Sequence, residues 1–317
     1  MWLNEFPGLG GAGIQPAVCS AQAAGENGSL DGFHDHRYTA LHRHMRRITV
    51  VLISCLLGAG FISRAADLNE IVERATAALK SDWAADPSYA CLEKDESEKN
   101  NKRTSKTVHD LMLDGSDYRM PVALNNQTFP RDRQDLEVTK LKNELKRREC
   151  ETDAARHSRI AAWKKRRDEE GDLLLSFPSI LTFQLIGEEE KDGHPTYVLS
   201  ATPKPGAVPA TTGAKVLTGV KGKVWVEKET MHPIHIECTV IKPVPVYGVL
   251  ASVLPGTEIE IRMTKVADSA WLIDLVSLKL NLAKLHFFKS AESTRYTYTE
   301  YLPNASALEK LLSEGTR

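Results

Sequence analysis

The amino-acid sequence predicts an α+β protein that is mainly antiparallel β. Between residues 181 and 302 one strand pattern follows another, and the strands are separated by turn signals rather than by helices. Several strands alternate apolar and polar residues, which is typical of an antiparallel sheet with one buried face and one wet face. Helical patterns are confined to residues 67–82, 131–170 and 305–312, so a doubly wound fold is not expected.

The composition is that of a folded globular protein. Hydrophobic residues make up 42% of the 317 positions and charged residues 26%, which excludes a disordered chain and a protein with many membrane spans. Lys and Arg number 41 against 42 Asp and Glu, so the net charge is -1. A nucleic-acid partner is therefore not expected, because binding to phosphates needs a surplus of cations.

Residues 45–66 have the features of a secretory signal peptide. Two arginines follow Met45 and precede the uncharged run 48–62, which is too short to span a bilayer, since a span needs about 20 residues. Small residues then fit a signal-peptidase site before Ala66. We expect a periplasmic mature protein that begins near Ala66 and has no transmembrane domain. Residues 1–44 are interpreted as an upstream segment outside the fold.

A second interpretation assigns a lipid anchor to the same segment. Leu52-Ile53-Ser54-Cys55 fits the four-residue motif at which bacterial lipoproteins are cleaved and acylated on the cysteine. The apolar run before Cys55 is short, and it continues beyond the cysteine, where a polar tether is usual. Ordinary cleavage is therefore favoured, and a membrane-anchored lipoprotein through Cys55 is the alternative.

Three cysteines remain in residues 67–317, at Cys91, Cys150 and Cys238. An odd number leaves at least one free thiol in an exported protein. One disulfide among the three is possible, although the sequence does not select the pair. Their spacings match no zinc pattern.

The first elements after residue 66 are a helix and a hairpin. Residues 67–82 place apolar side chains at three- and four-residue spacings, which predicts an amphipathic helix. Pro87 ends it, because the residue before a proline avoids the helical conformation. Segments 104–113 and 118–124 then flank Asp114-Gly115, a dipeptide suited to the tight turn of a β-hairpin.

Residues 131–170 differ in kind from the rest. Thirteen basic and ten acidic residues crowd into forty positions, and neither Gly nor Pro interrupts the run before Gly171. This predicts a long charged helical insertion, as one helix or a pair. Its apolar stripe is thin, so we expect a solvated segment that contributes little to the core. The alternative is a mobile cover over whatever the sheet encloses.

The remainder of the chain is a series of predicted strands. The first two flank Asp192-Gly193, a second hairpin signal. The strands are expected at 181–189, 196–201, 223–227, 234–241, 257–266, 271–285 and 294–301, followed by a short terminal helix at 305–312.

One face of these strands is the candidate binding surface. In 257–266, three apolar residues point one way and three charged residues point the other. Strand 271–285 can reach about 50 Å at roughly 3.3 Å per residue, a length that suits a curved sheet wrapped around something. The alternation nominates five side chains as the ligand-binding lining of a cavity: Ile236, Ile259, Ile261, Met263 and Val276.

Residues 67–317 contain no signature of catalysis in their sequence. Motifs for a serine nucleophile, a zinc peptidase and a phosphate loop do not occur there. The tightest cluster of possible metal ligands is His232, His235 and Glu237. On a strand His235 and Glu237 share a face and His232 points to the other, so the cluster falls one ligand short of a zinc site. We therefore expect no metal, no cofactor and no enzymatic activity.

The stretch Gly222-Lys223-Val224-Trp225-Val226-Glu227-Lys228-Glu229-Thr230, followed by Pro233 and Ile236-Glu237, has a distinctive pattern. A glycine precedes an apolar–Trp–apolar strand, then an acidic turn and a strand that ends in a charged residue. Together with residues 187–203, the signal peptide and the N-terminal helix, this pattern resembles the periplasmic lipoprotein-localisation factor superfamily, which includes outer-membrane lipoprotein-sorting proteins.

The resemblance implies both a fold and a function. Members of that superfamily have an unclosed, curved antiparallel β-barrel, a half-barrel covered by helices, with an apolar cavity. By resemblance, residues 67–317 form one such domain, which carries a lipid or the acyl chain of an acylated protein. An envelope sensor or scaffold that binds another envelope protein through the same half-barrel is the alternative. Hiding a 16-carbon chain from water is worth roughly 12 kcal/mol at about 0.8 kcal/mol per methylene.

Overall fold

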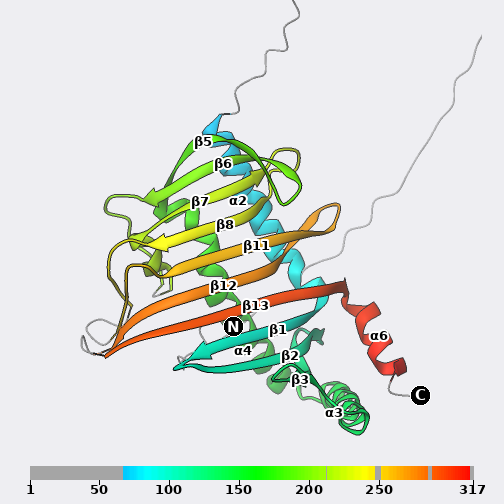
Figure 1. The fold of residues 1–317 in the computed structure, drawn as a ribbon. Helices are drawn as coiled ribbons and strands as arrows, with labels where there is room; N and C mark the ends of the chain where they lie inside the picture. Colours follow the sequence, from blue (N-terminus) through cyan, green and yellow to red (C-terminus); the bar gives the residue numbers. More distant parts are fainter. Residues whose placement is uncertain (1–66, 212, 247–250, 285–287, 315–317) are drawn as a thin grey trace, which may run out of the picture. The chain divides into compact units, whose positions relative to one another are not determined.

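The computed structural model describes residues 67–211, 213–246, 251–284 and 288–314. The predicted upstream segment and the predicted signal peptide, with Cys55, lie outside the described residues. The described chain forms one large antiparallel sheet with helices packed on it (Figure 1). The α+β, mainly antiparallel β fold predicted from the sequence is therefore confirmed.

The elements follow one another in two groups. The first group is α2 (Leu68–Ala85), η1 (Asp86–Ser88), β1 (Tyr89–Lys99), β2 (Lys102–Leu113), β3 (Ser116–Leu124), β4 (Gln127–Thr128), α3 (Arg131–Glu149), α4 (Asp153–Leu175) and α5 (Phe177–Ile180). The second group is β5 (Leu181–Lys191), β6 (His194–Pro203), η2 (Ala214–Gly219), β7 (Val220–Glu227), β8 (Pro233–Val240), β9 (Val244–Pro245), β10 (Ala251–Val253), β11 (Glu258–Ala267), β12 (Ala270–Lys284), β13 (Phe288–Pro303) and α6 (Asn304–Glu314).

Within the described residues the sheet has 13 strands and does not close into a barrel. Its main path runs β4-β3-β2-β1-β13-β12-β11-β8-β7-β6-β5, with β9 and β10 attached beside β12. The neighbouring strands along this path pair antiparallel. β1 pairs with β13 from the far end of the chain, with Glu93 opposite Tyr298, and so joins the first strands to the last. Figure 1 shows the strands fanning through a strong twist from β5 to β3.

Local turn chemistry places the hairpins. Asp114-Gly115 has φ angles of 45° and 84°, and Asp192-Gly193 has 50° and 82°. Both pairs occupy the left-handed region that a two-residue hairpin turn requires, and aspartate and glycine adopt it at the lowest cost. Asn100-Asn101, with φ angles of 52° and 59°, makes the β1–β2 turn by the same means, a turn not predicted from the sequence.

Two helices cover one face of the sheet, which we call the inner face. α2 packs against β12, β8 and β5, and α4 packs against β3 and α2 (Figure 1). Asp67 caps the N-terminus of α2, because its side chain accepts a hydrogen bond from the Asn69 N–H at 3.0 Å. Its buried face carries Ile71, Ala75 and Leu79 at the predicted helical spacing.

The charged segment 131–170 forms the predicted pair of helices, α3 and α4. The expectation that it contributes little to the core is wrong. Leu141 of α3 is fully buried, and α3 and α6 cover the other face of β1–β3. Here they complete a hydrophobic cluster of Ala90, Leu111, Leu113, Met120, Leu141, Ala307 and Leu311. A thin apolar stripe is sufficient because polar contacts supply the rest of the attachment.

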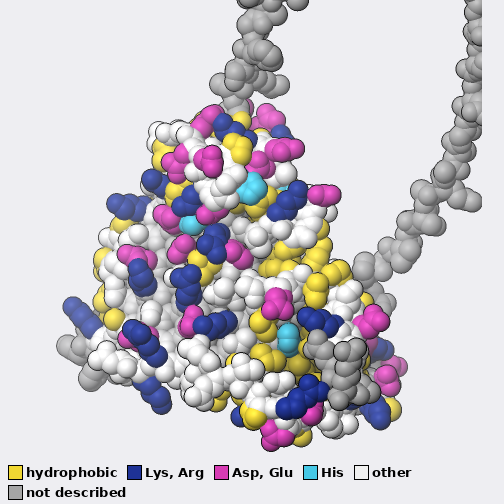
Figure 2. Space-filling view, turned by 45° about the vertical axis from the view of Figure 1, so that its right-hand side comes forward, with side chains coloured by type: hydrophobic (Ala, Val, Ile, Leu, Met, Phe, Trp, Pro, Cys, Tyr) yellow, Lys and Arg dark blue, Asp and Glu magenta, His cyan; other side chains and the backbone are white. Residues whose placement is uncertain are grey.

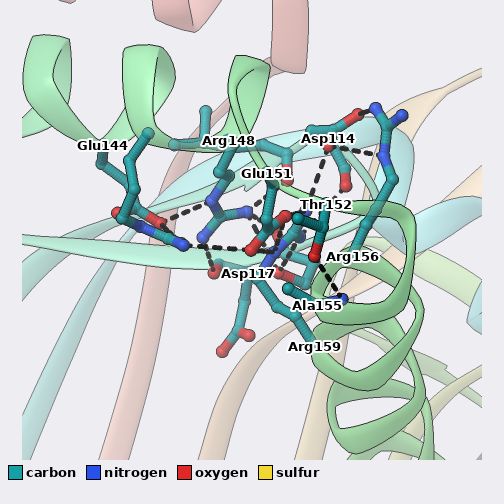
Figure 3. A network of polar contacts seen from close by, with 12 residues as sticks. Asp114, Asp117, Glu144, Arg148, Glu151, Thr152, Ala155, Arg156 and Arg159 are labelled. Carbon is teal, nitrogen blue, oxygen red and sulfur yellow. Dashed lines mark hydrogen bonds and ion pairs between the residues drawn. The ribbon is translucent and has the colours of Figure 1, made fainter.

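Those polar contacts converge on the β2–β3 turn (Figure 3). Arg148, which is buried, donates to the backbone oxygens of Leu113, Ser116 and Asp117, with distances of 3.1 Å for the last two. Figure 3 shows Arg156 and Arg159 of α4 reaching the same turn from the other side. Their partners are Asp114, which contacts both guanidinium groups, and Glu151, which is 2.7 Å from Arg159.

The described structure leaves Cys91, Cys150 and Cys238 as free thiols. The disulfide that three cysteines allow is therefore not formed. In the described ranges, no helix is long and apolar enough to cross a bilayer. Figure 2 shows Lys and Arg side chains interspersed with Asp and Glu side chains over the surface it presents, as expected from the nearly balanced charge.

Candidate ligand-binding cavity

A cavity of about 450 Å³ lies between the inner face of the sheet and helix α4. Its wall is built from the end of α2 and η1, from β1–β3, from β10–β13 and from α4, with a contribution from η2 and the residue before it. Small-molecule sites in proteins usually enclose about 300–1,000 Å³, so the cavity has the size of a binding site.

One part of the wall is aliphatic, and the register of β11 and β12 explains why. Ile261 lies opposite Val276 and Ile259 lies opposite Leu278, so four apolar side chains share one patch of the inner face. Between them, Glu260 points to the other face, as strand alternation requires. The aliphatic part of the wall is completed by Leu173, Leu174, Val216, Val253, Ile273 and Leu280.

Three of the five lining residues predicted from the sequence belong to this wall: Ile259, Ile261 and Val276. The other two, Ile236 and Met263, are buried but lie outside the lining. Ile236 is opposite Ile261 and shares its face, yet it lies on β8, over which α2 packs. At Met263 the β11–β12 register shifts, because a bulge follows Arg262. The alternation picks out the face that α2 and α4 cover, but it does not indicate where along that face the helices leave space.

The other part of the wall is polar, and no pattern in the sequence marks it as part of a site. Cys91, Asp110 and Arg119 lie opposite one another on β1, β2 and β3, so their side chains form a row on the inner face. Glu93 lies two residues beyond Cys91 on the same face and is only 1% exposed. Its Oε1 is 2.5 Å from Nη2 of Arg119, so a buried ion pair stands in the wall.

Helix α4 brings two further ion pairs to the polar part. Arg166 donates to Oδ1 of Asp117 at 2.8 Å, and Arg167 donates to Oδ2 of Asp86 at 2.8 Å. The guanidinium of Arg167 also stacks on the Trp83 ring at 4.1 Å. Burial raises the pKa of Asp86, although the charge of Arg167 opposes this shift. These contacts hold α4 against the end of α2 and against β3.

Asp110 differs from the other acids of this part of the wall. Among the described residues, no partner makes a hydrogen bond or an ion pair with its carboxylate. Burial raises the pKa of Asp110 to about 7, and the negative charges of Glu93 and Asp117 act in the same direction. The positive charge of Arg119 opposes them. Asp110 therefore changes its charge near neutral pH, unlike an ordinary aspartate.

The possible metal cluster lies elsewhere and is divided between the two faces of the sheet. Nδ1 of His235 is 3.1 Å from Oδ2 of Asp192, and its Nε2 is 3.2 Å from Oε1 of Glu237. His232 instead lies 3.3 Å from Asp82 of α2, on the inner face. Within the described ranges, no group of three His, Cys, Asp or Glu side chains is arranged to hold a metal ion.

No family model matches the sequence, and no match is found among curated proteins. Solved structures do match. A domain described as an outer membrane lipoprotein-sorting protein from Vibrio parahaemolyticus is 10% identical, with a TM-score of 0.31 over 75% of this chain and 97% of that chain. A LolA superfamily protein from Nitrosomonas europaea is 12% identical, with a TM-score of 0.27 over 73% and 96%.

The complex of MucA and MucB from Pseudomonas aeruginosa also matches, at 13% identity and a TM-score of 0.21, over 74% of this chain and 96% of that chain. The first two structures belong to the lipoprotein-sorting group that the sequence resembles.

Proposed function

We propose that the protein is an exported, non-catalytic carrier or binding protein for a lipid or for the acyl chain of a lipoprotein in the periplasm. The aliphatic part of the cavity carries the proposal, because Ile259, Ile261 and Val276 offer an apolar surface beside a helix cover. Burial of eight methylenes there would contribute roughly 6 kcal/mol before the costs of ordering the chain, enough for reversible binding.

The polar part of the wall supports binding rather than catalysis. Its three arginines are each paired with a carboxylate, which leaves none of these cations to stabilise a developing negative charge. The Cys91 thiol has its pKa raised well above 9 by burial and by nearby acids, which is the opposite of an activated nucleophile.

Binding of a fluorescent fatty acyl probe tests the proposal. We expect saturable binding by the parent protein and a loss of at least about tenfold in affinity in Val276→Trp, which would fill the aliphatic part. Ile261→Asp should have the same effect by placing a carboxylate in that wall. Ile186→Trp is the matched control, because Ile186 is 49% exposed on β5. Parent protein that does not bind the probe would contradict the proposal.

Identifying the native ligand and testing the predicted export both require protein purified from its own host. Organic extraction of the exported protein should recover lipid. A lipid-free protein that co-purifies with another polypeptide would instead favour the sensor or scaffold alternative. N-terminal sequencing of the same sample should begin near Ala66, whereas an acylated Cys55 would establish the membrane anchor.

A further inference from the structure

The polar part of the cavity wall has more carboxylates than its arginines can pair. Three guanidinium groups each contact one acid: Arg119 with Glu93 at 2.5 Å, Arg166 with Asp117 at 2.8 Å and Arg167 with Asp86 at 2.8 Å. Of the two acids that α4 adds to the wall, Glu169 is 3.6 Å from Lys165, and Glu170 is also engaged. Asp110 is the acid left over.

A partly buried carboxylate with no partner has lost part of its hydration, and a ligand that donates a hydrogen bond to it compensates that loss. Asp110 lines the same cavity as the aliphatic side chains of β11 and β12. A single amphiphile can therefore place its tail along Ile261 and Val276 and its head near Asp110. The charge of Asp110 then determines which head groups bind favourably in the cavity.

The buried donor Nε of Arg119 is the feature that would favour an anionic head instead. It has no hydrogen-bond partner among the described residues. The positive charge of Arg119 is already matched by Glu93, which is almost fully buried beside it. A second anion at this point would face the uncompensated carboxylate of Asp110, so a neutral acceptor suits Arg119 better than an anion does.

We propose that the cavity selects amphiphiles with a cationic, hydrogen-bond-donating head group, such as a primary ammonium, over those with a carboxylate or phosphate head, and that Asp110 is the residue that selects. This inference rests on the proposed function, since it concerns the head group of the lipid-like ligand. It assigns the polar wall a role in specificity, and the aliphatic wall supplies the affinity for the tail.

The inference has a pH signature. The charged and titratable groups that face Asp110, or line the cavity with it, are Tyr89, Cys91 and Glu93 of β1, Asp117 and Arg119 of β3, Asp86 of η1, Tyr298 and Tyr301 of β13, and Arg166, Arg167, Glu169 and Glu170 of α4. Because the pKa of Asp110 is about 7, its carboxylate ionises as the pH rises from about 6 to 8. The affinity for an ammonium head therefore rises over this range, and the affinity for a carboxylate head falls.

Competition between three amphiphiles of equal chain length tests the inference. Dodecylammonium, dodecanol and dodecanoate would each displace the neutral fluorescent probe N-phenyl-1-naphthylamine from the full exported protein at pH 6 and pH 8. At pH 8 we expect dodecylammonium to bind about tenfold tighter than dodecanol, and dodecanoate to bind more weakly than dodecanol. At pH 6 the three affinities should converge.

Asp110→Asn is the decisive variant, because it removes the charge and keeps the shape. It should bring the three affinities to within about twofold of one another at pH 8 and leave dodecanol binding unchanged, which also shows that the cavity is intact. Glu190→Gln, at an exposed site on β5, is the charge-matched control. Equal or tighter binding of dodecanoate by the parent, or an unchanged preference in Asp110→Asn, would overturn the inference and leave the proposed function standing. Failure of the probe and of all three amphiphiles to bind would overturn the proposed function itself.

Discussion

Gly222 shows how a residue of the resemblance pattern serves the fold. It lies opposite Cys238 in the β7–β8 ladder. A Cβ added at this position would be 2.3 Å from the backbone oxygen of Glu237 and 2.7 Å from Sγ of Cys238. The nearer neighbour is a backbone atom, so the two strands approach as closely as they do because residue 222 has no side chain.

Gly222→Ala should therefore destabilise the protein by about 1–3 kcal/mol, the usual cost of overpacking a tight contact. The free energy of unfolding from urea denaturation measures the effect. Gly187→Ala is the matched control, because Gly187 is also in a strand and a Cβ there would meet nothing within 4 Å. Equal stability of the two variants would show that β7 and β8 can move apart without cost.

Glu227 closes the turn that follows β7. Its carboxylate is buried and accepts hydrogen bonds from the backbone N–H groups of Glu229 and Thr230, at 2.9 Å and 2.6 Å, and from the Thr230 hydroxyl at 2.6 Å. Burial alone would raise the pKa of Glu227, but these hydrogen bonds outweigh it and lower the pKa below 4.5. The turn is thus stabilised by the ionised carboxylate.

Glu227→Gln should cost about 1–3 kcal/mol of unfolding free energy at pH 7, since it loses charge-assisted hydrogen bonds. Because the pKa is lower in the folded state, the stabilisation is fully present above about pH 4.5 and is lost as the pH falls through the folded value. Denaturation curves recorded at pH 7 and at acid pH should therefore differ between parent and variant at pH 7 and approach each other as the pH falls through the folded pKa. A constant difference at both would contradict this assignment.

At the scale of elements, the α3–α4 pair is fastened to the β2–β3 hairpin and is not a loose insertion. Arg148 is 6% exposed, and its guanidinium satisfies the carbonyl oxygens at the hairpin's end. The contacts of Arg166 and Arg167 then hold α4 over the cavity. The cover is therefore attached at both the hairpin and the end of α2.

Arg148→Ala should detach this cover, because it leaves several buried carbonyl groups without a donor. We expect residues 131–170 to resist trypsin in the parent protein, and we expect the variant to lose about 3 kcal/mol of unfolding free energy and to be cleaved faster within that segment. Arg131→Ala is the control, since Arg131 makes an exposed ion pair with Asp135 at 3.1 Å, worth roughly 0.3–0.5 kcal/mol. Rapid cleavage of the parent segment would restore the interpretation as a solvated insertion.

Elements with local signals were predictable and those that depend on distant partners were not. The hairpins at Asp114-Gly115 and Asp192-Gly193 follow from turn chemistry, and α2 follows from apolar spacing. The polar wall does not, because Asp110 and Arg119 alternate with apolar residues as they would on a wet face. Only the packing of α4 over this face makes it an interior, and nothing in the local pattern reveals that packing.

At the scale of the whole described unit, the open sheet leaves a space between its inner face and the helices. In a closed barrel or a two-layered sheet, packed side chains would fill that space. The path ends at β4 and β5 without closing, and the helices on the inner face cover it unevenly. α2 packs over β8, where Ile236 is buried, whereas α4 stands away from β11 and β12. The sequence predicted the curved sheet and its apolar face, but the position of the cavity depends on where each helix lies.

Quenching of tryptophan fluorescence by a neutral dodecanol brominated at mid-chain tests the central claim most directly, since bromine quenches at contact. Trp83 and Trp163 line the cavity, whereas Trp225 lies outside the lining, with its Nε1 bonded to Glu189 at 2.5 Å. We predict saturable quenching of the parent protein. The double variant Trp83→Phe with Trp163→Phe should lose that quenching, and Trp225→Phe should retain it. Quenching that never saturates, or that persists in the double variant, would contradict a ligand held between α4 and the sheet.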